Sequence, residues 1–276
     1  MGTHVSEARP RRSGLTRRQK ARLGRGIQYA VGLAIVVALA VNVNWQQFGD
    51  AFGRWDIVLR MLPRVITIGV VNTLIYTALA FVFAFLLGLL LAMMKLSSIG
   101  PYRWVATAYV EFFRGVPALV VLFMVAFGIP NAFPGFSFPG GQLGMVMVGL
   151  GVTAAAYMAE TFRAGIQAVP KGQVEAARTL GMSHSRTMAT IVIPQAFRIV
   201  IPPLTNELIL LVKDSSLVYV LGLATSQYEL TKFSQDFLNK TTNPTPLMVG
   251  AVCYLAITLP LSLLVRRLEH RYAKAR

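Results

Sequence analysis

Long apolar stretches, separated by short polar or Gly/Pro-rich segments, dominate the chain. A helix needs roughly 20 apolar residues to cross a bilayer. Runs of about this length occupy 64–94, 104–128, 143–166, 199–224 and 247–265. A shorter run, 27–43, lies near the lower limit for a span. The pattern predicts an all-α integral membrane protein with about six transmembrane helices.

Composition supports the bilayer as the solvent. The 276 residues are 55% hydrophobic and only 14% charged, against roughly 25% charged in soluble domains, and the mean hydropathy is +0.57. A net charge of +16 would suggest a nucleic-acid partner. Here Lys and Arg gather at the two ends and in short loops, which favours membrane orientation, so no nucleic-acid partner is expected. The single cysteine, Cys253, excludes an internal disulfide.

The polar segments divide the chain into five parts. Residues 1–26 carry eight Lys/Arg and one acid and form a basic cytoplasmic tail, expected to be disordered. Residues 27–43 form an anchor helix or, alternatively, a signal peptide cleaved after an Ala-Leu-Ala sequence. The basic leader is long for a signal peptide, so an anchor is favoured. Residues 44–63 mix aromatic and charged side chains, as in an outer interfacial segment. Residues 64–267 form the transmembrane core, and 268–276 a cytoplasmic tail.

The distribution of basic residues predicts the orientation. With the N-terminus inside, inner segments hold 20 of the 27 Lys/Arg and outer segments hold five. Cytoplasmic loops carry the excess of Lys and Arg in membrane proteins. Both termini and the polar loop at 170–198 are therefore expected in the cytoplasm, with 129–141 and 225–246 as outer loops.

The 170–198 loop has the signals of two short helices. A polar loop this long between spans is expected to have its own structure or a function. Residues 174–180 can form about two turns, which Gly181 would end in a left-handed conformation. Ser183 is the expected N-cap of a second helix over 184–193. Pro194 then sets the entry to the next span.

The spacing within this loop resembles a known signature. Glu175-Ala176-Ala177, three residues, Gly181, nine residues and Ile-x-Ile-Pro194 are similar to the signature loop of membrane subunits of bacterial ABC importers, with Ile193 where that family usually has Leu. Four further blocks look like the polar amino-acid branch of these permeases: 111–117, 160–166, 172–175 and 213–217. The resemblance covers about residues 64–267.

The resemblance implies a division of labour among subunits. The core would have five transmembrane helices and pair with a second permease subunit, identical or related. Two ABC ATPase subunits would dock from the cytoplasm, and an extracytoplasmic binding protein would deliver a polar L-amino acid, with glutamate or glutamine favoured. The location implied is the bacterial inner membrane. The residues expected to couple to the ATPases are Gly172, Glu175, Ala176, Ala177, Gly181 and Pro194.

The chain itself is expected to bind no cofactor and to be no enzyme. A phosphate-binding Walker loop needs Gly-Lys-Ser/Thr, and the sequence contains no Gly-Lys dipeptide. ATP would therefore be used by the partner ATPase. The three histidines are far apart in the sequence, and no zinc motif is present, so no metal site is expected.

Ionisable residues inside spans are costly and are candidates for function. Six such residues could line the substrate path or form ion pairs that hold the helices in register: Glu111, Arg114, Glu160, Arg163, Lys213 and Asp214. Helix rise places Arg114 and Glu160 at similar depth, which predicts that they pair. Glu111 would then pair with Arg163.

Two other classes of protein could explain the spans. An ion-coupled secondary transporter or channel would account for the intramembrane charges. It would leave the two-helix loop unexplained, and such carriers usually show internal repeats with broken helices, which the sequence lacks. A membrane scaffold could use the loop to recruit a partner. ATP-dependent uptake separates an importer from both.

Overall fold

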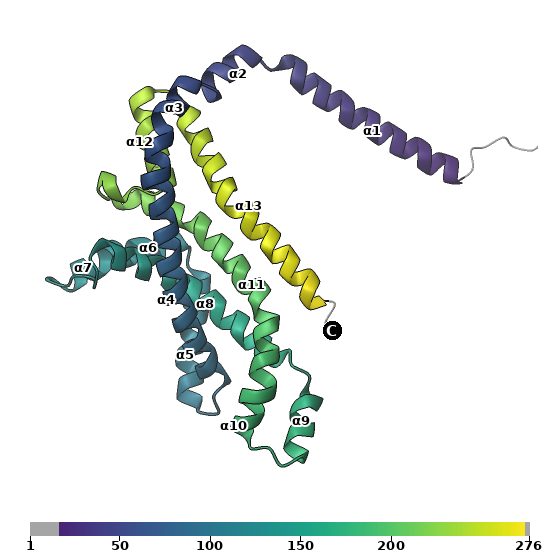
Figure 1. Ribbon diagram of the computed structural model, residues 1–276, viewed down its shortest axis with the longest axis vertical. Helices are drawn as coiled ribbons and strands as arrows, with labels where there is room; N and C mark the ends of the chain where they lie inside the picture. Colours follow the sequence, from purple (N-terminus) through teal and green to yellow (C-terminus); the bar gives the residue numbers. More distant parts are fainter. Residues whose placement is uncertain (1–16, 274–276) are drawn as a thin grey trace, which may run out of the picture. The chain divides into compact units, whose positions relative to one another are not determined.

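The computed structural model describes residues 17–273, and in that part helices are the only regular secondary structure (Figure 1). Five helices are long and apolar enough to cross a membrane, or up to six if one bent pair counts as a span. The prediction of an all-α membrane protein is therefore confirmed. The chain divides after Gly53 into two compact units.

The N-terminal unit contains α1 (Arg17–Asn42) and α2 (Trp45–Phe52). α1 begins inside the predicted basic tail, so residues 17–26 are helical rather than disordered; residues 1–16 lie outside the described part. Asn44 caps α2, because its Oδ1 accepts a hydrogen bond from the Gln47 N–H at 3.0 Å. The choice between an anchor helix and a cleaved signal stays a prediction.

The second unit begins with helices that lead into the core, and it ends with two helices that pack against each other. Its first half contains α3 (Trp55–Arg64), η1 (Val65–Val70), α4 (Val71–Leu96), α5 (Gly100–Gly115), α6 (Ala118–Phe123), η2 (Met124–Gly128), α7 (Ile129–Ala132) and α8 (Gln142–Gln167). Its second half contains α9 (Lys171–Thr179), α10 (His184–Thr187), η3 (Met188–Val192), α11 (Ile193–Asp214), η4 (Ser215–Leu221), η5 (Thr225–Gln227), α12 (Leu230–Thr241) and α13 (Thr245–Ala273).

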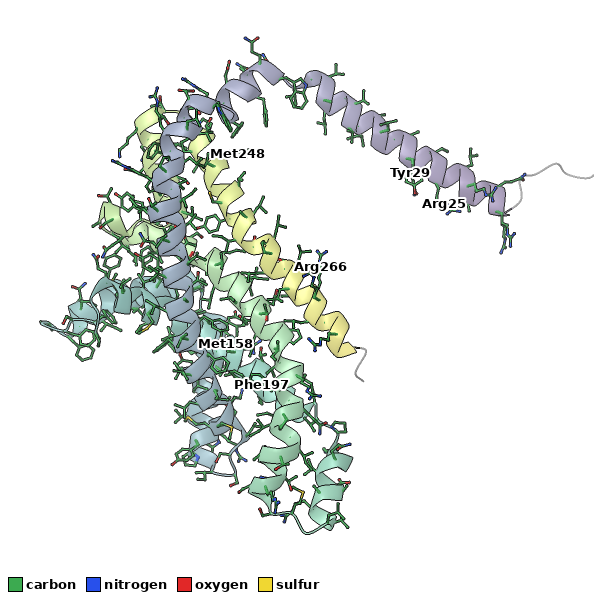
Figure 2. All side chains as sticks on the ribbon, in the orientation of Figure 1. Arg25, Tyr29, Met158, Phe197, Met248 and Arg266 are labelled. Carbon is green, nitrogen blue, oxygen red and sulfur yellow. The ribbon has the colours of Figure 1, made fainter. Side chains whose placement is uncertain are left out.

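The core forms where α4 and α8 pack against each other through small residues. A Cβ on Gly88 would lie 2.9 Å from the Met158 Cβ and 3.0 Å from the Ala155 carbonyl oxygen. Small residues at such contacts let membrane helices approach closely and gain dispersion energy. Met158 is fully buried, whereas Phe197 on α11 is 51% exposed (Figure 2). Apolar side chains on the outside are expected where lipid replaces water.

The predicted span at 104–128 is broken rather than continuous. The axis turns by 109° between α5 and the segment that begins with α6. Val116 is extended (φ −98°, ψ 134°), the conformation favoured before a proline, and Pro117 is the N-cap residue of α6. Gly115 and Pro117 mark this point in the sequence but do not show the direction that the chain takes beyond them, so the sequence did not reveal the bend.

The predicted outer loops also contain helices. α12 lies within 225–246, and α7 within 129–141. α12 was missed because its buried side is short, with only Leu230, Phe233 and Ser234 buried, and polar residues lie between its apolar ones. Together with Met61, Val65 and Val249, the two apolar residues form a cluster at the end of the unit opposite the α9–α10 loop (Figure 1).

Candidate coupling loop and intramembrane cavity

The loop between α8 and α11 is a closed helical hairpin. Gly181 has φ +83°, the left-handed conformation predicted for it. The Gly181 N–H donates to the Arg178 carbonyl at 3.0 Å, and the Met182 N–H donates to the Ala177 carbonyl at 3.1 Å. This pair of hydrogen bonds is the Schellman motif, which satisfies the last carbonyls of a helix. The Ser183 hydroxyl accepts from the Arg186 N–H at 3.4 Å and caps α10 as predicted.

The residues of the predicted signature have different exposures. Ala177 is 2% exposed and faces the hairpin interior, whereas Glu175, Ala176 and Gly172 are exposed. Leu180, which follows α9 at the tip of the hairpin, is 84% exposed. The exposed edge of α9 is therefore thin, polar on one side and apolar at its end. Such an edge can enter a groove on another protein with its backbone close to the partner.

The hairpin is joined to the spans by packing and by backbone continuity. Val169, Val192 and Ala196 form a buried apolar cluster beneath it. The predicted end of the second helix at 193 is wrong, because α10, η3, α11 and η4 form one helical stretch from His184 to Leu221. Pro194 lies in the first turn of α11, directly after η3 and inside this stretch.

The predicted pairing of the intramembrane charges is wrong. Glu160 binds Lys95, through a short contact to the Lys95 Nζ, and Arg163, at 2.6 Å from the Arg163 Nη2. The Arg163 Nη1 also donates to Gln167 at 2.6 Å. Glu160 therefore does not pair with Arg114. The sequence did not single out Lys95, because it lies in the last turn of α4, and a lysine at the end of an apolar run is typical of the inner end of a span.

The other intramembrane candidates lie apart from this cluster. The Arg114 guanidinium lies 5.5 Å from the centre of the Tyr157 ring, a cation–π geometry. Glu111 is exposed, and the Arg163 expected to pair with it binds Glu160 instead. Lys213 is exposed, whereas the neighbouring Asp214 is half-buried. Of the six candidates, Glu160 and Arg163 belong to an ion-pair cluster, Arg114 and Asp214 line a cavity, and Glu111 and Lys213 belong to neither group.

That cavity has a volume of about 490 Å³ and lies between the α5–α6 break, α8 and α11. Small-molecule pockets span roughly 300–1,000 Å³. Its polar lining comes from three elements: Arg114 from the break, Thr153 and Tyr157 from α8, and Glu207 and Asp214 from α11. Non-helical backbone at membrane depth is tolerated where it lines such a space. The break between α5 and α6 therefore has a structural role, because it opens the cavity.

Three of the polar lining residues, Thr153, Tyr157 and Glu207, were not among the predicted candidates. Glu207 lies on α11, in the same span as Lys213 and Asp214. An acidic residue inside a span is itself a sign of function, so the sequence did contain a signal for Glu207. Thr153 carries no charge and could not have been found from the sequence. It is 8% exposed, and its hydroxyl has no hydrogen-bond partner among the described residues. In the same part of the chain no group of His, Cys, Asp and Glu could hold a metal ion.

Comparison with known proteins shows where this architecture occurs. Residues 84–274 match the family described as "Binding-protein-dependent transport system inner membrane component". The chain belongs to that family. It is 41% identical over 207 residues to the "Probable glutamine ABC transporter permease protein GlnM" of Bacillus subtilis strain 168, covering 75% of this chain and 93% of the relative. It is 39% identical over 224 residues to the "Glutamate/aspartate import permease protein GltK" of Escherichia coli O6:H1, covering 79% and 98%.

A solved structure supports the same assignment. The "Crystal structure of an amino acid ABC transporter with histidines" matches with a TM-score of 0.69 at 37% identity, covering 78% of this chain and 96% of that one. The prediction of an amino-acid ABC permease subunit is confirmed against the ion-coupled carrier or channel.

Proposed function

We propose that this chain is one of two permease subunits of an ATP-driven importer of polar L-amino acids, and that ATPase subunits drive it through α9. The observation that supports this most directly is the unbroken helical stretch from His184 to Leu221. It begins in the hairpin and carries Glu207 and Asp214 to the cavity. At about 1.5 Å per residue, His184 and Glu207 are roughly 35 Å apart along the path.

A displacement of the hairpin would be transmitted along this stretch. Backbone hydrogen bonds make a helix stiff along its axis, and the apolar cluster of Val169, Val192 and Ala196 ties the hairpin to the spans. ATP binding and hydrolysis in the partner would move α9 and, through α10 and α11, the cavity walls. Access to the cavity would then alternate between the two sides of the membrane. ATP would be bound by the partner, and this chain would need no cofactor.

Membership of the family supports the remaining partners of this proposal. An extracytoplasmic binding protein would deliver the amino acid to the outer side, and a second permease subunit, identical or related, would complete the path. The chain would lie in the bacterial inner membrane with both termini in the cytoplasm. The supporting observation is the excess of Lys and Arg in the segments placed inside.

Uptake into vesicles tests the proposal. Proteoliposomes that contain this chain, the second permease subunit and the ATPase partner, with the binding protein outside, are expected to accumulate a labelled amino acid only when ATP is inside. A matched preparation with a non-hydrolysable ATP analogue is expected to accumulate none. Uptake driven by an ion gradient without ATP would contradict the proposal, and so would the absence of uptake for every amino acid supplied.

A further inference from the structure

The first turns of α1 hold a positive charge that no neighbouring side chain balances. Five exposed basic residues lie within positions 17–25: Arg17, Arg18, Lys20, Arg22 and Arg25. The sequence has no acidic residue between Glu7 and Asp50. In the described part of the chain, none of the five forms an ion pair. The inner segments of the second unit also carry more Lys and Arg than acid, so the counter-charge is expected from outside the chain.

Three of these cations share one face of α1. Arg18, Arg22 and Arg25 follow one another at spacings of four and three residues, which places their side chains side by side on a helix. The Arg25 Nε donates to the Ala21 carbonyl at 3.3 Å, and its two terminal nitrogens have no partner among the described residues. A guanidinium group binds phosphate oxygens through two parallel hydrogen bonds. The face is therefore suited to phosphate groups.

The rest of α1 indicates that these phosphates belong to a membrane. The helix is long and apolar enough to cross a bilayer, and none of its residues is buried against the protein. Tyr29 is 77% exposed and follows Arg25 by four residues, so both lie on the same face of α1 (Figure 2). Tyrosine is enriched where spans pass the lipid headgroups. If α1 spans the bilayer, its basic turns therefore lie at headgroup level, beside the hydrocarbon.

We propose that the first turns of α1 bind anionic phospholipids, with phosphatidylglycerol-type headgroups held by Arg18, Arg22 and Arg25. Clusters of Lys and Arg directly beside a span attract anionic lipids, and each cation near the surface strengthens the attraction about fivefold. Zwitterionic lipids carry no net charge and would leave the cations unbalanced. α1 lies outside residues 84–274, which match the family, and this inference does not rest on the proposed function.

Quenching of a dye on α1 tests this inference in the full chain. A neutral dye is attached to Gly24→Cys in a Cys253→Ala background, because a Cβ at Gly24 would meet no atom within 4 Å and Cys253 is the single native cysteine. The protein is placed in nanodiscs that contain the same fraction of quencher on either phosphatidylglycerol or phosphatidylcholine. Phosphatidylglycerol is expected to quench at least about threefold more strongly. Equal quenching by the two lipids would overturn the inference.

Two triple variants connect the lipid preference to this face of α1. The first removes its cations: Arg18→Gln, Arg22→Gln and Arg25→Gln. It is expected to reduce the excess quenching by phosphatidylglycerol at least about twofold. The matched control removes three exposed cations near the end of α13: Arg266→Gln, Arg267→Gln and Arg271→Gln. The control is expected to keep the excess; an unchanged excess in the first variant, or an equal loss in both, would overturn the inference.

Further measurements keep all the arginines in place and so do not depend on the folding of a variant. Raising KCl from about 0.05 M to about 0.5 M is expected to reduce the excess at least about twofold, because salt screens exposed charges. Inorganic phosphate at the same ionic strength is expected to do no more than KCl. Displacement of the lipid by inorganic phosphate or by a short RNA would assign the cations to another partner and overturn the inference. An intact mass that shows α1 removed from the mature protein would overturn it as well.

Discussion

Single residues decide how this membrane core tolerates charge. Glu160 is held between Lys95 and Arg163, and the Lys95 and Glu160 side chains are only 14% and 20% exposed. Removing one partner of a mostly buried pair leaves the other charge without compensation, which is far more costly than never having had the pair. The three residues therefore act as one structural unit that ties the end of α4 to α8.

Charge reversal at this cluster is expected to destabilise the protein. Glu160→Lys places a third cation beside Lys95 and Arg163 and is expected to cost about 3 kcal/mol of stability. The double variant Lys95→Glu with Glu160→Lys is expected to recover much of that loss. The thermal midpoint in detergent measures both. As a control, the exchange Arg114→Glu with Glu160→Arg is expected to give no recovery, because the structure does not pair those two residues. Recovery by that exchange would contradict the observed pairing.

Glu229 is a second residue whose surroundings predict its behaviour. It is 1% exposed and accepts hydrogen bonds from the Lys232 N–H at 2.6 Å and the Tyr254 hydroxyl at 3.0 Å. It lies before α12, outside the spans. Burial raises the pKa of its carboxyl group from 4.5 to about 7, against the hydrogen bonds that favour the charged form. The Lys232 amine is turned toward the Tyr228 ring.

The raised pKa predicts how stability depends on pH. Between about pH 4.5 and 7 the folded protein keeps a proton on Glu229 that the unfolded chain has lost. The free energy of unfolding is therefore expected to fall as the pH rises through this window, by up to about 3 kcal/mol, and to level off above it. Glu229→Gln is expected to remove this part of the slope in thermal midpoints measured from pH 4.5 to 8. Asp236→Asn should keep it; equal slopes for wild type and Glu229→Gln would refute the assignment.

At the scale of elements, the α9–α10 hairpin depends on one backbone conformation. A Cβ on Gly181 would meet no atom within 4 Å, so substitution there acts through the positive φ and not through a clash. A left-handed residue other than Gly costs about 1–2 kcal/mol, and Asn less than most. The position therefore allows a test of the coupling role that leaves the packing of the spans unchanged.

Gly181→Val is expected to loosen the hairpin and to reduce the ATPase activity stimulated by loaded binding protein several-fold, with the protein still inserted. Gly181→Asn, which tolerates the left-handed conformation, is the matched control and is expected to keep most of the stimulation. The measurement is ATP hydrolysis by the reconstituted complex with and without binding protein. Full stimulation in the Val variant would count against α9 as the coupling element.

At the scale of the whole second unit, the molecule joins two sites through one helical stretch. The hairpin and the cavity are separated by many residues of α10, η3 and α11, yet the backbone continues from one to the other. Pro202 and Pro203 lie within that stretch, and each removes a helical hydrogen bond. Vesicle uptake tests this coupling in the intact complex.

Local signals in the sequence were enough to predict the hairpin. Gly181 and Ser183 act through the backbone of their own and neighbouring residues, so their roles follow from side-chain chemistry a few positions away. The existence of the spans was equally accessible, because a run of apolar residues requires burial in lipid wherever it packs. These features depend on short stretches of chain, and so the sequence by itself determined the membrane class, the hairpin and the family.

Tertiary structure alone decided which residues meet. The Lys95–Glu160 pair joins α4 to α8 and depends on the close approach of these two helices at Gly88. The cavity lining brings Thr153 of α8 and Glu207 of α11 together beside the 109° turn between α5 and α6. Counting helix rise from a loop cannot supply such contacts, because a bend or a tilt changes depth and direction at once. Periodicity describes each helix alone, whereas the cavity and its charges arise only where three elements pack together.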